Sequence, residues 1–121
     1  MPKFLDALAL AGYCALIYWL SSQPSLPIAP LFSWQDKVHH FSAYAIMSIL
    51  AWRAFRHLSK SPGLTLIAAV VFCSLFGLSD EWHQSYVPGR TADAWDWLAD
   101  TLGALAVAYG LRRFGRVQTK S

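Results

Sequence analysis

Acidic and histidine side chains recur at helical spacings in three separate segments of this 121-residue chain. In the first segment Asp36 and His40 are four positions apart, so both lie on one face if the segment is helical. Tyr44 continues the same stripe. Carboxylates and imidazoles together can bind a divalent metal ion or transfer protons. The other interpretation is a capping aspartate followed by an interfacial histidine, and the residues alone leave both open.

The second segment places acids at the end of a long apolar run. Asp80 and Glu81 follow the apolar residues 64–78 directly, and His83 and Gln84 come next. At the C-terminal end of a helix the dipole disfavours a negative charge by a few tenths of a kcal/mol to about 1 kcal/mol. Acids that break a local rule without local compensation indicate a functional site. Asp80, His83 and Gln84 share a face, and Glu81 is rotated from it by about 100°.

The third segment carries three aspartates in an i, i+3, i+7 pattern, Asp93, Asp96 and Asp100. The same stripe continues through Gly103 and Ala104, whose small size suits close helix packing, so we expect it to face other helices. Asp93 and Asp96 are also explained as first-turn acids that the helix dipole favours. Asp100 lies about two turns into the helix, where that explanation fails. Its alternative role is an interhelical hydrogen bond, with the carboxyl either charged or protonated.

A turn carrying one arginine separates the second segment from the third. Pro88 and Gly89 are a turn signal that ends the preceding helix, and Arg90 follows them. The Arg90 guanidinium suits a phosphate or a carboxylate, and a headgroup contact is the plainer alternative. Because so many acids lie nearby, we expect Arg90 to form a salt bridge with one of them.

The elements that position these residues are predicted to be membrane-spanning helices. Charged residues make up 14% of the chain and hydrophobic residues 55%, whereas soluble domains carry about 25% charged residues. We expect helices over residues 4–20, 36–55 and 91–111, and one that begins near residue 64 and ends at Pro88-Gly89. Thr91 is the expected N-cap of the last helix, and residues 21–35 are expected to lie on the membrane. The predicted fold is all-α, one integral membrane bundle of about four transmembrane helices over residues 1–121. Each run is slightly short for a bilayer, so a soluble bundle is the alternative, but tryptophans near the run ends favour a membrane.

The lysines and arginines give this bundle a direction. With four spans, eight of the ten lie on one side of the membrane, at residue 3, within residues 53–60 and within residues 112–120. Only Lys37 and Arg90 lie on the opposite side. The positive-inside rule then places both termini in the cytoplasm and the acids at the outer face. This distribution argues against a nucleic-acid partner, although the net charge is +3. Cys14 and Cys73 lie within apolar runs and are expected to be buried rather than paired.

Two motifs together resemble those of the VanZ-like membrane proteins. The first is Asp36-Lys37-x-x-His40-Phe41-x-x-Tyr44, and the second is Ser79-Asp80-Glu81-x-His83-Gln84, then Pro88-Gly89-Arg90, Asp93, Asp96, Asp100 and Gly103. The resemblance covers residues 36–107 and implies a compact four-helix fold in the bacterial inner membrane. The family is named for an accessory protein linked to resistance to the glycopeptide teicoplanin. Asp100 stands where other members often have Asn, which makes a hydrogen-bonding role as plausible as a charged one.

Two classes of function remain open. The first is a metal-assisted enzyme that acts on a lipid-linked envelope substrate at the outer face. Its predicted residues are Glu81, His83, Asp36 and His40 for catalysis, Arg90, Tyr44 and Gln84 for substrate binding, Asp80, Asp96 and Asp100 for a divalent metal, and Pro88, Gly89, Asp93 and Gly103 for structure. The second is a non-catalytic envelope protein whose polar residues hold the helices together or bind a lipid headgroup, a glycopeptide-related ligand or a partner.

The sequence favours the non-catalytic class, because no nucleophile motif accompanies the acids. A proton or ion pathway is disfavoured, because Asp6 is the only acid or histidine expected in the inner half of the spans. No motif demands an oligomer.

Overall fold

The computed structural model describes residues 2–23, 34–90 and 92–119, with side chains described as far as Phe114. Within these ranges the chain forms four helices and no strand: α1 (Lys3–Ser21), α2 (Gln35–Phe55), α3 (Pro62–Gln84) and α4 (Ala94–Thr119). The prediction of an all-α fold with four helices is therefore confirmed.

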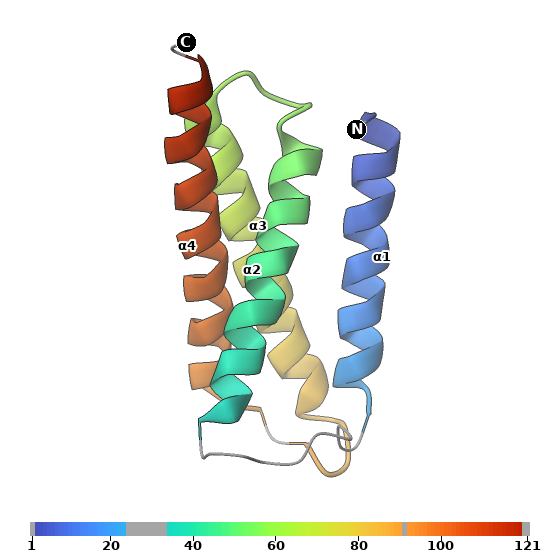
Figure 1. The fold of residues 1–121 in the computed structure, drawn as a ribbon. Helices are drawn as coiled ribbons and strands as arrows, with labels where there is room; N and C mark the ends of the chain where they lie inside the picture. The colour runs from blue at the N-terminus through green and yellow to red at the C-terminus, as the bar shows by residue number, and fades with distance from the viewer. Residues whose placement is uncertain (1, 24–33, 91, 120–121) are drawn as a thin grey trace.

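The helices run alternately up and down, so that the start of α1 and the end of α4 lie at the same end of the bundle (Figure 1). The most extensive packing is between α2 and α4, followed by α3 against α4. α1 packs on α2 and α3 but not on α4, which makes it the outlying helix. The starts of α2 and α4 and the end of α3 meet at the end of the bundle opposite the termini (Figure 1).

Small residues allow α2 and α4 to approach closely. A Cβ atom added to Gly103 would lie 2.2 Å from the carbonyl oxygen of Phe41, so the two backbones touch at this glycine. Two turns further along α2, the Ser48 hydroxyl donates a hydrogen bond of 2.8 Å to the carbonyl of Ala104. The predicted stripe of small residues on α4 thus faces the bundle, as expected of helices that associate in a membrane.

The surface of the bundle is apolar and its interior is partly polar. Large hydrophobic side chains are exposed on all four helices, among them Phe4, Ile46, Leu75 and Leu102. The acids Asp80, Glu81, Asp96 and Asp100 are buried instead. Two helices, α1 and α3, are long and apolar enough to cross a membrane. An apolar surface of this extent marks a lipid or protein contact rather than contact with water.

Both boundaries of α4 differ from the sequence prediction. α4 begins at Ala94 rather than near Thr91, which lies outside the described residues. Asp93 is the residue that caps it, because its carboxylate accepts a hydrogen bond of 2.9 Å from the backbone N–H of Trp95. α4 also continues to Thr119, beyond the expected end at Leu111. Most of the connection expected on the membrane surface, residues 24–33, is likewise outside the described residues.

Candidate functional site

His40 lies at the centre of the polar cluster that α2, α3 and α4 form at the end opposite the termini. Its Nδ1 atom is 2.8 Å from Oδ1 of Asp100, at hydrogen-bond distance. Its Nε2 atom is 3.7 Å from Oδ2 of Asp96 and 4.0 Å from Oδ1 of Asp36. One imidazole thus faces a carboxylate of its own helix and two carboxylates of α4. The predicted pairing of Asp36 with His40 on one helix face agrees with this geometry.

Lys37 neutralises the outer part of this cluster. Its Nζ atom lies 2.6 Å from Oδ1 of Asp96, 2.8 Å from Oδ2 of Asp93 and 3.8 Å from Oδ2 of Asp36. The hydrogen bond from Lys37 holds the pKa of the Asp93 carboxyl below its usual range. The sequence places Lys37 within a motif but does not indicate its role, because its main partners, Asp93 and Asp96, lie more than fifty residues away.

Glu81 adds the third helix to the cluster. Its Oε2 atom accepts a hydrogen bond of 2.8 Å from the backbone N–H of Asp93, which joins the end of α3 to the start of α4. Its other oxygen, Oε1, is buried without a hydrogen-bond partner among the described residues, as is Oδ2 of Asp100. One potential ligand atom from each of His40, Glu81 and Asp100 lies within 4.8 Å of the other two. The same holds for Asp36, His40 and Asp96.

Asp80 and His83 face α1 instead of this cluster. The Ser21 hydroxyl at the end of α1 donates a short hydrogen bond to Oδ1 of Asp80. The His83 ring stacks on Tyr18, with 4.4 Å between ring centroids. The structure therefore divides the predicted residues: neither Asp80, expected as a metal ligand, nor His83, expected as a catalytic group, joins the ligand atoms gathered around His40.

The residues predicted to bind substrate lie in three different settings. Arg90 donates through Nη1 to the carbonyl of Gln23 at 3.1 Å and approaches that of Leu20 at 3.5 Å. Among the described residues, Arg90 therefore caps the end of α1 instead of forming the expected salt bridge with an acid. Tyr44 is 2% exposed and packs near Phe76, and Gln84 is also buried, so neither offers a free surface to a ligand.

The predicted turn residues are found in the expected conformation. Pro88 and Gly89 follow the end of α3, and Gly89 has a φ of 83°, a conformation that favours glycine. Asp93 caps α4, and Gly103 provides the close contact with α2.

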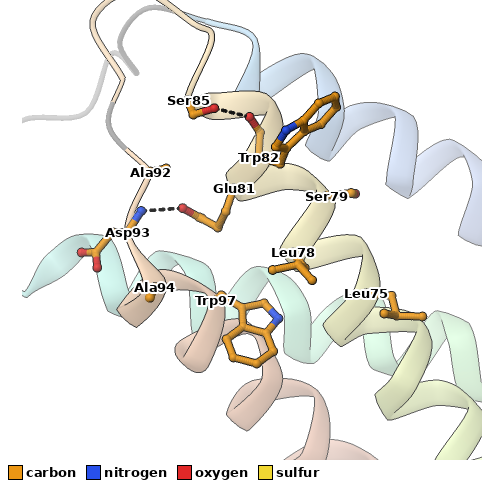
Figure 2. A pocket seen from close by; sticks show the side chains of 10 residues that line it. All are labelled: Leu75, Leu78, Ser79, Glu81, Trp82, Ser85, Ala92, Asp93, Ala94 and Trp97. Carbon is orange, nitrogen blue, oxygen red and sulfur yellow. Dashed lines mark hydrogen bonds between the residues drawn. The ribbon is translucent and has the colours of Figure 1, made fainter.

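A groove of about 700 Å³ opens between the end of α3 and the start of α4 (Figure 2). Leu75, Leu78 and Trp97 provide its apolar walls. Figure 2 shows Glu81 reaching from α3 toward the backbone of Asp93, with Leu78 and Trp97 further along the groove. Glu81 is therefore shared between the groove and the His40 cluster.

A second polar cluster, which the sequence did not reveal, lies at the end of the bundle near the termini. Asp6 of α1 is buried, and its Oδ2 atom is 2.7 Å from Nε2 of His57. Its Oδ1 atom accepts a hydrogen bond of 3.2 Å from Nε of Arg53, and Nη2 of Arg56 lies 3.8 Å from Oδ2. The sequence identified Asp6 only as an acid in the inner half of the spans, whereas in the structure it fastens α1 to the end of α2.

The described helices have an apolar surface and bury several acids, and two of them can cross a membrane. These features are typical of a membrane-associated helical bundle. Within that class the chain belongs to the VanZ/LLP1 family, which it matches over residues 9–115. The resemblance stated from the two motifs is thereby confirmed.

One relative comes from a eukaryote. "Uncharacterized protein C11E3.10" of Schizosaccharomyces pombe is 30% identical over 106 residues, which cover 83% of this chain and 61% of that protein. The chain therefore matches about three fifths of that relative's length. No solved structure matches the chain.

Proposed function

We propose that this chain is a four-span protein of the cell-envelope membrane that binds an amphiphilic membrane ligand at its outer face without transforming it. The observation that carries the proposal is the groove between α3 and α4, whose apolar walls lead to the buried carboxylate of Glu81. An acyl or prenyl chain fits the apolar walls. A hydroxyl or amine of the headgroup would then donate to the Glu81 carboxylate, which lines the groove.

The burial pattern of α2 and α4 supports four spans rather than two. Both helices have enough residues to cross a bilayer, 21 and 26 respectively. The acids Asp96 and Asp100 of α4 are buried in the bundle, while Ile46 of α2 and Leu102 and Tyr109 of α4 are exposed. Apolar side chains therefore face outward on these helices, where lipid would be. The excess of lysine and arginine at the end near the termini supports an orientation with that end in the cytoplasm.

A lipid-linked envelope precursor has the amphiphilic shape that the groove requires. Binding such a precursor is the simplest connection between this site and the glycopeptide resistance that gives the VanZ-like proteins their name. The relative in fission yeast favours a ligand whose chemistry is shared by bacterial and fungal membranes.

Lipid that copurifies with the protein tests this proposal. The full chain is purified in a mild detergent, and bound lipid is counted by native mass spectrometry. Ala94→Trp fills the groove, and Glu81→Gln removes its charge. Both variants are expected to retain at most about a tenth of the lipid bound to the unaltered chain.

The matched control is Leu102→Trp, which adds a similar ring to an exposed position of α4 outside the groove. It should retain the lipid. Equal lipid on all four proteins would show that the groove is not the binding site.

The second candidate is a metal-assisted enzyme acting on the same kind of ligand. It is favoured by one observation, that Glu81 belongs both to the groove and to the cluster around His40 and Asp100. A headgroup at Glu81 would then lie beside groups able to transfer a proton. Mass spectrometry of the bound lipid after prolonged incubation separates the two candidates, because an enzyme changes the headgroup mass and a binding protein does not.

A further inference from the structure

We propose that His40, Glu81 and Asp100 bind one divalent cation of intermediate hardness, Zn²⁺ or Mn²⁺, inside the bundle. The three residues come from α2, α3 and α4, and the chosen ligand atoms lie within 4.8 Å of one another. Bonds of about 2.0–2.2 Å place neighbouring ligands roughly 3–4 Å apart around an ion. Modest side-chain rotation therefore closes the site. One imidazole with two carboxylates suits zinc or manganese better than a purely oxygen-based set.

Two unpaired oxygens point to a ligand that completes this site. Oε1 of Glu81 and Oδ2 of Asp100 have no hydrogen-bond partner in the part of the chain that the structure describes. Their residues are 6% and 0% exposed. A buried polar atom without a partner is costly, more so when it carries charge. A cation held by these oxygens would remove that cost.

The charge distribution favours this set over the neighbouring one. Asp36, His40 and Asp96 are also close enough to share an ion, but the Lys37 ammonium already lies 2.6 Å from Asp96. Arg90 is engaged with carbonyls of α1. Neither cationic side chain therefore pairs with Glu81 or Asp100.

Metal binding must displace a proton from this site. In the metal-free arrangement one proton lies between Nδ1 of His40 and Oδ1 of Asp100, which are 2.8 Å apart. A cation that binds these groups releases that proton to water, as metal sites in proteins commonly do.

The experiment uses the full chain purified in mild detergent without chelator. Elemental analysis by mass spectrometry should find close to one zinc or manganese per chain. After treatment with a chelator, titration of Zn²⁺, Mn²⁺ and Mg²⁺ is followed by calorimetry and by thermal unfolding. Zinc or manganese should raise the unfolding midpoint of the unaltered chain, because a ligand that binds only the folded state stabilises it.

Variants identify the ligands. Glu81→Gln and Asp100→Asn keep the shape of the side chain and should weaken metal binding by at least about tenfold. Asp36→Asn tests the neighbouring set. Asp80→Asn is the matched control: it removes an equal charge from an adjacent carboxyl of α3 that faces α1, and it should bind metal as the unaltered chain does.

Three results would overturn the proposal. The first is the absence of both copurified metal and any metal-induced shift in the unaltered chain, a measurement that does not depend on whether a variant folds. The second is loss of metal in Asp36→Asn with retention in Glu81→Gln, which would place the ion at the neighbouring set. The third is a shift with Mg²⁺ alone. Because the assay needs no lipid, its outcome is independent of the groove proposal.

Discussion

At the scale of single residues, the site depends on a contact between two helices, in which His40 meets Asp100 at 2.8 Å. Asp100 has no exposed surface, and a built Cβ atom at Gly77 would lie 2.8 Å from its Oδ2 atom, so its carboxylate packs closely against α3. The sequence left open whether this aspartate acts by charge or by hydrogen bonding. In the metal-free protein the geometry supports hydrogen bonding, and the proposed cation would add the need for charge.

Substitutions at Asp100 separate these two contributions. Asp100→Asn keeps an acceptor for His40 and should lower the free energy of unfolding of the metal-free protein by about 1 kcal/mol or less. Asp100→Ala leaves His40 without its partner and a cavity beside Gly77, so a loss of about 1–3 kcal/mol is expected. Unfolding by denaturant in detergent with chelator measures both. Equal losses would mean that the hydrogen bond is unimportant.

At the scale of helices, α4 forms a tight interface with α2, whereas α1 packs less extensively and also has polar contacts near both ends. Gly103 provides the closest approach in the first case. In the second, Asp6 holds one end of α1, and Ser21 with Arg90 holds the other. Between them the Tyr13 hydroxyl donates a hydrogen bond of 2.5 Å to the carbonyl of Ala43.

Adding one methyl group at Gly103 should separate α2 from α4. The new Cβ atom would lie 2.2 Å from the Phe41 carbonyl oxygen, and backbone cannot move aside as a side chain can. Gly103→Ala is expected to lower the free energy of unfolding by about 1–3 kcal/mol.

Gly110→Ala is the control on the same helix, since nothing lies within 4 Å of its built Cβ atom. It should be neutral or stabilising by about 0.5–1 kcal/mol, because alanine favours helix over glycine. Thermal or denaturant unfolding of the two variants compares them directly. A destabilised Gly110→Ala with an unaffected Gly103→Ala would contradict the interface described.

Removing the buried acid of α1 should loosen that helix. Asp6→Ala leaves Arg53 and His57 without their shared partner and is expected to lower the unfolding midpoint and to increase proteolysis of α1. Asp36→Ala removes an exposed acid from the opposite end of the bundle and serves as the control. If both variants unfold at the same temperature, Asp6 does not anchor α1.

At the scale of the whole molecule, the two polar clusters occupy opposite ends of an apolar bundle. The His40 cluster is rich in carboxylates, while the cluster near the termini places Asp6 beside Arg53, Arg56 and His57. This polarity supports the proposed orientation, in which both termini lie in the cytoplasm.

Chemical labelling tests the proposed orientation. In a chain carrying Cys14→Ala and Cys73→Ala, Tyr86→Cys and Leu58→Cys each provide one thiol, at positions that are 71% and 81% exposed. A membrane-impermeant maleimide applied to intact cells should label position 86, after α3, and leave position 58, between α2 and α3, unlabelled. Position 58 should react only after the membrane is permeabilised. The reverse pattern would invert the topology.

Local sequence determined the parts of this protein that depend on near neighbours. Helical spacing placed Asp36 with His40 and aligned Asp96, Asp100 and Gly103, because residues three and four apart share a helix face whatever the fold. Apolar runs separated by residues 21–35, by residues 56–63 and by Pro88-Gly89 predicted the four helices. The acids gathered at one end because successive helices run in opposite directions. This alternation brings the starts of α2 and α4 to the end of α3.

Only the tertiary structure decided which of these groups meet. How far each helix is rotated about its own axis depends on contacts between helices, such as Gly103 against Phe41, and no local pattern specifies that rotation. It directs Glu81 toward His40 and turns His83 and Asp80 toward α1. The partners of Lys37 and of Asp6 likewise lie 47 to 59 positions away along the chain, so their roles emerged only when the helices packed.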